Sequence, residues 1–284
     1  MTAPRTVGVL GGGRMGAGIA HAFLLAGADV VVVERDDNQA DAAAERVRQS
    51  VARSLELGAV AGSLDRYEAA FSTATDAAAF VDCDLVIEAV PEDRAVKTEA
   101  LARAERAMPA ASVLASNTSS ISIDDLAANL ERPERFLGLH FFNPVPASTL
   151  VEVVVGAATS PDVIAAGREW VGAIDKTAIV VRDSPGFASS RLGLALGLEA
   201  IRMLEERVAD AEDIDAAMML GYRHPVGPLR TTDIVGLDVR LGIAQELAAH
   251  LGERFEPPAL LRRMVAEGKL GRKSGEGFYV WKDE

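Results

Sequence analysis

The hydrophobic and polar positions of the first 180 residues follow two alternating patterns. Short runs of β-branched and other apolar residues predict strands, and longer Ala-rich stretches with apolar residues three and four positions apart predict helices. The predicted strands are residues 6–10, 29–33, 85–89, 113–116, 136–140, 151–155 and 177–181. The clearest predicted helices are residues 14–26, 41–57 and 94–108. This alternation is typical of βαβ units and predicts a mostly parallel sheet in the α/β class.

The pattern changes after residue 181. The segment R-D-S-P-G at residues 182–186 is rich in turn formers, and the remainder is predicted to be helical until a strand at residues 277–281. Residues 187–207 are almost continuously apolar, which predicts a helix buried on several sides. The helices predicted at 210–220, 237–251 and 258–268, or a second subunit, would cover it. We therefore predict an α/β domain over residues 1–182, an all-α C-terminal domain over residues 183–284, and a homodimer.

Composition and charge narrow the class of protein. A chain of 284 residues with 49% hydrophobic and 25% charged residues has the balance of a globular protein and the length of two ordinary domains. Its 42 acidic residues outnumber 29 basic ones, and the net charge of −13 disfavours nucleic acid as a partner. No apolar stretch approaches the roughly 18 residues of a membrane span, and the first residues lack a signal peptide, so we expect no membrane association and a cytoplasmic location.

Metal and disulfide chemistry is not expected. Cys83 is the only cysteine, so an internal disulfide and a thiolate zinc cluster are excluded, and we expect it to be a small buried hydrophobe. The four histidines show no metal-ligand spacing.

A glycine-rich turn follows the first predicted strand. The segment G-G-G-R-M-G contains the pattern G-x-G-x-x-G at Gly11, Gly13 and Gly16, and the predicted helix follows it directly. Glycines there allow a tight turn, the approach of a pyrophosphate to the backbone, and close packing of the helix. Together with Met15, this turn is predicted to bind a dinucleotide in a Rossmann-like domain.

An acidic residue closes the second predicted strand. Glu34 lies 18 positions beyond Gly16, where a carboxylate accepts hydrogen bonds from a ribose 2′-hydroxyl and repels a 2′-phosphate. NAD is therefore favoured over NADP. The neighbouring Arg35 is a competing signal, because a guanidinium could pair with that phosphate.

His140 and Glu152 are the candidate acid/base pair. His140 ends a predicted strand, where open α/β folds place their chemistry, although a lone histidine among apolar residues is more often a core residue. Glu152 lies in the apolar run L-V-E-V-V-V and needs a partner. If residues 143–149 turn the chain back, Glu152 holds one nitrogen of the imidazole and leaves the other to accept a proton.

The sequence resembles the short-chain L-3-hydroxyacyl-CoA dehydrogenases, also called 3-hydroxybutyryl-CoA dehydrogenases, over nearly its full length. The matching segments are G-G-G-R-M-G-A-G-I-A at 11–20, I-E-A-V-P-E-D at 87–93, S-N-T-S-S-I-S-I at 116–123, G-L-H-F-F-N-P-V-P at 138–146, E-D-I-D at 212–215, H-P-V-G-P-L at 224–229, G-L-D at 236–238 and L-G-R-K-S-G-E-G-F-Y at 270–279. The resemblance implies NAD-dependent interconversion of 3-hydroxyacyl-CoA and 3-ketoacyl-CoA, with an acyl-CoA thioester as substrate and a role in fatty acid metabolism. It also implies that substrate enters between the two domains.

The resemblance assigns roles to further residues. His140 would be the catalytic base, Glu152 its orienting carboxylate, and Ser119 a hydroxyl near the substrate 3-oxygen and the nicotinamide. Further contacts with NAD would come from residues matching Glu92, Lys97, Asn143 and Lys273. From their residue types alone, Glu92 and Lys97 would be a solvated helix start, and Ser119 an ordinary helix cap before Ile121.

Three departures from the family pattern bear on the substrate. Ser190 stands where the family usually has a substrate-contacting Asn, and the residues 147–149, A-S-T, are often bulkier or basic in relatives. Ser50 matches a coenzyme A position, but Leu57 replaces an expected Lys, for which Arg53 is a candidate substitute. We expect retained activity with altered substrate preference.

Rival functions stay open at this stage. They are a dehydrogenase of the same fold acting on a carrier-protein-linked hydroxyacyl group, a sugar acid or carnitine; a hydroxyisobutyrate-type enzyme with a catalytic lysine; and a dinucleotide-binding protein without catalysis.

Overall fold

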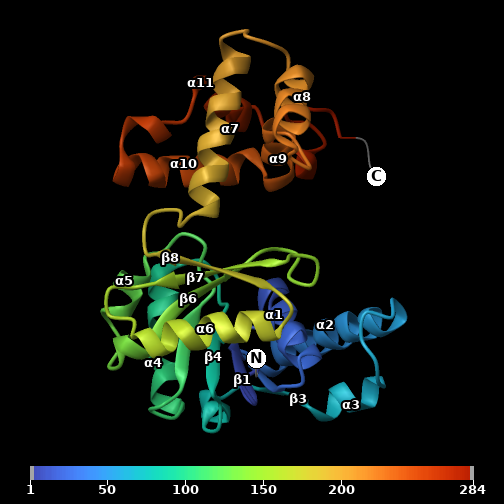
Figure 1. Cartoon of the computed structure of the whole chain (residues 1–284), viewed down its shortest axis with the longest axis vertical. Helices are drawn as coiled ribbons and strands as arrows, with labels where there is room; N and C mark the ends of the chain where they lie inside the picture. Colours follow the sequence, from blue (N-terminus) through green and yellow to red (C-terminus); the bar gives the residue numbers. More distant parts are fainter. Residues whose placement is uncertain (1–2, 282–284) are drawn as a thin grey trace. The chain divides into compact units, whose positions relative to one another are not determined.

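The chain forms two compact units, Met1–Ser184 and Pro185–Glu284, in a computed structural model that describes residues 3–281 (Figure 1). Within these described residues, no helix combines the length and the apolar character that crossing a membrane requires.

The first unit is built on one eight-stranded sheet. Its strands are β1 (Thr6–Leu10), β2 (Asp29–Val33), β3 (Phe71–Ala74), β4 (Leu85–Glu88), β5 (Val113–Ser116), β6 (Phe136–Phe141), β7 (Leu150–Val155) and β8 (Thr177–Arg182). They lie in the order β3-β2-β1-β4-β5-β6-β7-β8, and every neighbouring pair is parallel except β6 and β7. The predicted mostly parallel sheet is confirmed, and each strand predicted before residue 182 is present with ends shifted by at most one residue.

Helices cover both faces of this sheet. They are α1 (Arg14–Leu25), α2 (Asp37–Glu56), α3 (Leu64–Ala69), α4 (Arg94–Ala107), α5 (Ile123–Ala127) and α6 (Pro161–Ala173), with 3-10 turns η1 (Ala77–Phe80) and η2 (Pro133–Arg135). Apolar residues of α1, α2 and α6 form one core with alternate residues of the strands, such as Val7 and Val9. The intervening Gly8 faces Phe80 of η1, which α4 contacts, on the opposite face.

The strand order creates a topological switch point between β1 and β4. The chain continues from β1 into α1 and from β4 into α4, and these two helices pack on opposite faces of the sheet. Open α/β sheets bind ligands in the crevice that this switch leaves beyond the carboxyl ends of the strands. Gly11, Glu34, Glu88 and Ser116 all stand at those ends.

The second unit is helical, as predicted. It contains α7 (Ser189–Glu205), α8 (Ala211–Tyr222), α9 (Pro228–Val235), α10 (Leu237–Leu251) and α11 (Ala259–Ala266), with 3-10 turns η3 (Glu253–Phe255) and η4 (Arg272–Ser274). The apolar helix α7 packs against each of the other four helices, which bury Leu194, Leu198 and Ile201.

The strand predicted at residues 277–281 is absent from the described part of the chain. Only single bridges join Gly271 to Glu276 and Glu276 to Val280. The buried carboxylate of Asp233 instead accepts the backbone N–H groups of Phe278 and Tyr279, so these donors are not available to a neighbouring strand. The β-type composition of this segment was therefore a misleading signal, because a side chain takes the place of a strand.

Candidate active site

The turn between β1 and α1 leaves space for an anion. Gly11 has a φ of +97°, and a Cβ at Gly16 would lie 1.8 Å from the carbonyl oxygen of Gly11, so both positions require glycine. A Cβ at Gly13 would meet no atom within 4 Å, and the first turn of α1 has no side-chain cap. An uncapped helix N-terminus with open space before it fits the pyrophosphate of a dinucleotide.

Glu34 is held against this turn. Its Oε1 accepts the backbone N–H of Gly12 at 2.7 Å, while Arg46 of α2 donates to the Gly12 carbonyl oxygen at 3.2 Å. The competing Arg35 is largely exposed and pairs with Asp36, with Nε 3.1 Å from Oδ2. The acidic group at the end of β2 is thus fixed beside the glycine turn, whereas the charge of Arg35 is compensated locally.

His140 and Glu152 are cross-strand neighbours. Antiparallel pairing of β6 and β7 sets them directly opposite each other, and Nδ1 of His140 lies 2.7 Å from Oε2 of Glu152. The carboxylate has no exposed surface, and only 8% of the histidine side chain is exposed. Residues 143–149 turn the chain back as predicted, with a cis peptide bond between Asn143 and Pro144. The imidazole also packs on the ring of Phe142, with ring centroids 4.6 Å apart.

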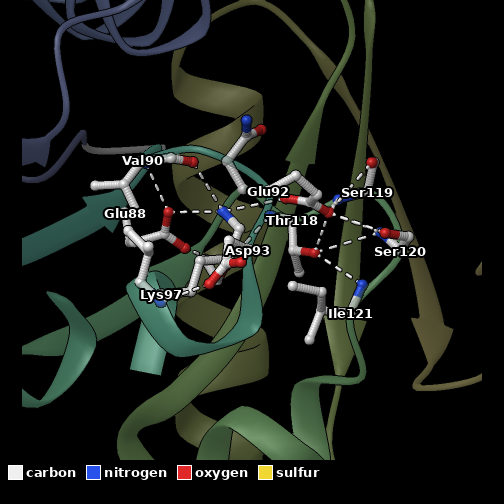
Figure 2. A network of polar contacts seen from close by, with 12 residues as sticks. Glu88, Val90, Glu92, Asp93, Lys97, Thr118, Ser119, Ser120 and Ile121 are labelled. Atoms are coloured by element: carbon white, nitrogen blue, oxygen red, sulfur yellow. Dashed lines mark hydrogen bonds and ion pairs between the residues drawn. The ribbon is translucent and has the colours of Figure 1, made fainter. Parts of the chain in front are cut away.

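Glu92 accepts several hydrogen bonds from the S-N-T-S-S segment, residues 116–120 (Figure 2). Its Oε1 accepts Thr118 Oγ1 at 2.6 Å, the N–H groups of Ser119 and Ser120 at 2.9 and 3.2 Å, and both serine hydroxyls at 3.3 and 3.1 Å. Burial raises the pKa of Glu92, but the charge of Lys97 and these hydrogen bonds outweigh it and bring the pKa below its ordinary value. The helix cap of α5 is Ser122 rather than Ser119.

Lys97 is buried, unlike a residue of a solvated helix start. Its Nζ lies 2.7 Å from Glu88 Oε1, 3.2 Å from the Val90 carbonyl oxygen and 3.2 Å from Glu92 Oε2. Glu88 itself is fully buried at the end of β4, and its Oε2 accepts the hydroxyl of Ser116 at 2.5 Å. Sequence reasoning missed Glu88 and Ser116. A carboxylate directly after the apolar run L-V-I was the available signal, by the same argument that singled out Glu152.

Six of the predicted site residues line one hollow of about 400 Å³ at the carboxyl ends of the strands. They are Met15, Glu92, Lys97, Ser119, His140 and Asn143. Asn117 also lines it and was not predicted; its Oδ1 accepts the N–H of Phe141 at 2.9 Å and so links β5 to the strand that carries His140.

Ser50 lies in a second hollow, of about 540 Å³, between α1, α2 and the segment after β6. Its lining includes Arg14, Arg46 and Arg53, and it reaches Asn143, which the two hollows share. Leu57, at the position of the expected Lys, is 65% exposed at its rim. Three arginine residues therefore line the hollow in which Leu57 stands in place of the expected lysine.

Two predicted site residues belong to the second unit. Ser190 lies in the first turn of α7. Lys273 lies in η4, where its Nζ donates a hydrogen bond to Asp238 Oδ2 at 2.6 Å, and this hydrogen bond lowers the pKa of Asp238. Neither residue lines the two hollows of the first unit. Among residues 3–281, no group of three or more His, Cys, Asp or Glu side chains is arranged to hold a metal ion.

A mostly parallel sheet with an open glycine turn, a carboxylate directly after the second strand and a buried His–Glu pair at the strand ends defines a dinucleotide-dependent dehydrogenase. The sequence matches "3-hydroxyacyl-CoA dehydrogenase, NAD binding domain" over residues 6–184 and "3-hydroxyacyl-CoA dehydrogenase, C-terminal domain" over residues 186–281. The chain belongs to the 3-hydroxyacyl-CoA dehydrogenase family.

Individual relatives agree over almost the whole length. A 3-hydroxybutyryl-CoA dehydrogenase of Mycobacterium tuberculosis is 43% identical over 280 residues, which are 97% of this chain and 98% of that protein. The crystal structure of an (S)-3-hydroxybutyryl-CoA dehydrogenase from Ralstonia eutropha has a TM-score of 0.94 at 37% identity and covers 99% of this chain and 100% of its own. The structure of a diketoreductase acting on dicarbonyl compounds has a TM-score of 0.85 at 31% identity, over 99% of this chain and 100% of its own.

Proposed function

We propose that this protein interconverts (S)-3-hydroxyacyl-CoA and 3-ketoacyl-CoA with NAD, and that 3-hydroxybutyryl-CoA and acetoacetyl-CoA are its substrates. The observation that carries the proposal is the 2.7 Å contact of His140 with Glu152 in the hollow that also contains Ser119. Bound NAD supplies hydride transfer to or from C3 of the substrate. The protein's own groups then have two tasks, which are to transfer a proton and to stabilise the charge that develops on the substrate oxygen.

His140 is the proton acceptor in this proposal. With Nδ1 donating to the buried carboxylate of Glu152, Nε2 is the nitrogen that takes the proton from the substrate 3-hydroxyl. Glu152 fixes the tautomer and stabilises the imidazolium that forms. In the reverse direction the same nitrogen returns the proton. General acid/base catalysis of this kind contributes roughly 10²- to 10⁴-fold.

Ser119 and Ser190 are proposed to contact the substrate. Ser119 lines the same hollow as His140, which supports a role for its hydroxyl in stabilising charge on the 3-oxygen. Ser190 has a shorter side chain than the usual Asn and lacks the paired donor and acceptor of an amide, which we expect to alter substrate preference. Turnover of Ser190→Ala within a factor of two of the parent on every acyl-CoA tested would contradict that role.

The cofactor contacts come from the turn and from the groups around it. Gly11, Gly13 and Gly16 with Met15 would hold the pyrophosphate end, and Glu34 the adenosine ribose. The local pairing of Arg35 with Asp36 supports NAD rather than NADP, because it leaves Glu34 as the uncompensated charge. Glu92, Lys97, Asn143 and Lys273 are proposed as further contributors to the NAD site.

Coenzyme A is the favoured carrier. Its phosphates require basic contacts, and Arg14, Arg46 and Arg53 line the hollow that contains Ser50. Within residues 3–281, the guanidinium of Arg53 pairs with exposed Glu56 at 3.2 Å, a surface ion pair that a phosphate would readily displace. This arrangement compensates for Leu57.

A second candidate is a dehydrogenase of the same fold that oxidises another hydroxy acid, such as a sugar acid or carnitine, or a carrier-protein-linked hydroxyacyl group, or that reduces small dicarbonyl compounds. Its support is the similarity to the diketoreductase and the small side chains at residues 147–149. The basic hollow around Ser50 favours coenzyme A over this candidate.

The helical unit is the proposed dimerisation surface as well as a substrate domain. Leu192, Leu220 and Tyr222 are each more than 70% exposed there, and such large apolar side chains are usually covered by a partner. A homodimer, a cytoplasmic location and a role in fatty acid metabolism remain predictions. Sedimentation of the purified protein, with Leu220→Glu as the matched variant, tests the dimer.

The test of the function is the fall in absorbance of NADH, and separately of NADPH, on addition of acetoacetyl-CoA and longer 3-ketoacyl-CoAs. The expected result is fast oxidation of NADH, but not of NADPH, when acetoacetyl-CoA is added. Turnover of free dicarbonyl compounds without any turnover of acyl-CoA would replace the proposal by its rival, and a preference for NADPH would overturn the role of Glu34.

A further inference from the structure

A buried chain of charges lies beneath the Ser119 segment. Lys97 is 1% exposed and Glu88 is fully buried. Such groups are rare in protein interiors unless they are paired. The ammonium of Lys97 has three N–H donors and three acceptors around it, on Glu88, Val90 and Glu92. Every donor of Lys97 therefore has a partner within the protein, and its action on a ligand passes through Glu92.

The two carboxylate oxygens of Glu92 contact different groups, Lys97 on one side and the Ser119 segment on the other. Oε2 faces Lys97, and Oε1 takes the donors of Thr118, Ser119 and Ser120 (Figure 2). The shortest of these bonds is to the Thr118 hydroxyl, at 2.6 Å, and the longest is to the Ser119 hydroxyl, at 3.3 Å. The main chain of Ser119 is thus held by a shorter hydrogen bond than its hydroxyl is. Because the hydrogen bond of the hydroxyl is long and weak, the hydroxyl can easily exchange Glu92 for a substrate oxygen as its acceptor.

Glu88 supports the same segment by a second route. Its Oε2 accepts the Ser116 hydroxyl at 2.5 Å, and Ser116 Oγ in turn accepts the N–H of Thr118 at 3.2 Å. Its Oε1 accepts the N–H of Val90 and holds the Lys97 ammonium, each at 2.7 Å. One buried carboxylate therefore fixes the start of the segment through Ser116 and its centre through Lys97 and Glu92.

We propose that Glu88 is a positioning residue for the reaction, which sets the main chain of residues 118–120 through Lys97 and Glu92 and so directs the Ser119 hydroxyl into the hollow of His140. This inference rests on the proposed function. It assigns Lys97 an indirect action, through the carboxylate of Glu92. A displacement of a catalytic group by about 1 Å costs on the order of 10²-fold in rate, so loss of the Glu88 charge is expected to lower kcat by about 10- to 100-fold.

The matched control is another buried carboxylate of the same unit. Glu105 lies two turns after Lys97 in α4 and accepts the N–H groups of Glu131 and Arg132 at 2.9 and 2.7 Å. Its hydrogen bonds and ion pair within residues 3–281 are with Glu131 and Arg132 rather than with the Ser119 segment, and it does not line either hollow. Glu105→Gln therefore reproduces the loss of a buried carboxylate without the loss of positioning.

The experiment compares Glu88→Gln with Glu105→Gln in the full chain by amide hydrogen exchange and by NADH oxidation with acetoacetyl-CoA. Exchange is expected to rise at residues 118–120 in the first variant and at residues 131–132 in the second. Only Glu88→Gln is expected to lose kcat, with KM for acetoacetyl-CoA changed by less than about threefold because the interaction acts on the transition state.

Coupling to Ser119 separates positioning from a merely structural role. In the Ser119→Ala background, Glu88→Gln is expected to lower kcat by less than about threefold, because the group it positions is already gone. If Glu88→Gln alone does not fold, Glu88→Gln with Lys97→Met removes both buried charges, and its kcat is expected to stay low. The proposal is overturned by full additivity with Ser119→Ala, by unchanged exchange at residues 118–120, or by a kcat within a factor of two of the parent. A parent protein without NADH oxidation would instead refute the proposed function, and the exchange comparison would still decide whether Glu88 holds the segment.

Discussion

The stability of the first unit should depend on pH through a histidine outside the active site. His21 of α1 is 3% exposed, and its Nε2 lies 2.9 Å from the hydroxyl of Ser54 in α2. Burial, with a smaller contribution from the charge of Lys176, lowers the pKa of His21 from 6.5 to about 4. The native state therefore binds this proton more weakly than the unfolded chain does.

The sign and size of the effect follow from this difference. The contribution of neutral His21 to stability is fully present above pH 6.5, where both states are neutral, and is lost as the pH falls toward 4. A pKa difference of about 2.5, at about 1.36 kcal/mol for each pKa unit, corresponds to a loss of roughly 3 kcal/mol between those two pH values. Below pH 4 the contribution stays constant.

The assay is urea unfolding of the parent and of His21→Gln at pH 7, 6, 5 and 4, with both proteins carrying Trp281→Phe. Trp170 is then the only tryptophan, and it packs against the core of the first unit. The difference between the two free energies of unfolding cancels the contribution of the carboxylates that titrate in the same pH range, because both proteins contain them. The advantage of the parent over the variant should shrink by about 3 kcal/mol between pH 7 and pH 4. A difference that is constant with pH would refute the reasoning.

Three further variants test the other parts of the account. Glu34→Gln removes the charge that faces a 2′-phosphate, so the ratio of KM for NADPH to KM for NADH should fall at least about tenfold, and an unchanged ratio in initial rates would contradict its role. Arg53→Ala should raise KM for acetoacetyl-CoA about tenfold while leaving KM for acetoacetyl-pantetheine unchanged, because the latter lacks the nucleotide; equal effects on both would exclude the phosphate contact. Asp233→Asn should destabilise the second unit by about 3 kcal/mol in urea unfolding followed by Trp281, because the carboxylate accepts three N–H donors, including the indole of Trp281. A loss below about 0.5 kcal/mol would show that these bonds contribute nothing.

The parts of the fold that local pattern controls could be predicted. Buried parallel strands such as β1 and β2 are continuous apolar runs bounded by turns, so their ends are visible in the sequence. The strand β3 was missed because F-S-T-A is short and partly exposed at the sheet edge, and it becomes a strand only by pairing with β2.

The same distinction applies to the site. His140 and Glu152 were recognisable because a carboxylate in an apolar strand needs a partner, and an antiparallel return supplies one. Lys97 was not recognisable from local pattern, because R-A-V-K-T-E has the composition of a solvated helix start. Its burial depends on Glu88, which is nine residues away and on another element, and on Glu92. Contacts of this kind between elements are fixed by packing, which the sequence pattern does not record.

The most direct test of the central claim compares the parent protein with His140→Gln in NADH oxidation by acetoacetyl-CoA, with NADH binding followed by fluorescence in the same samples. The account predicts that the variant binds NADH with an affinity within about twofold of the parent and loses roughly 10²- to 10⁴-fold in kcat. A variant that binds NADH normally and retains substantial turnover would contradict the claim that His140, held by Glu152, transfers the proton.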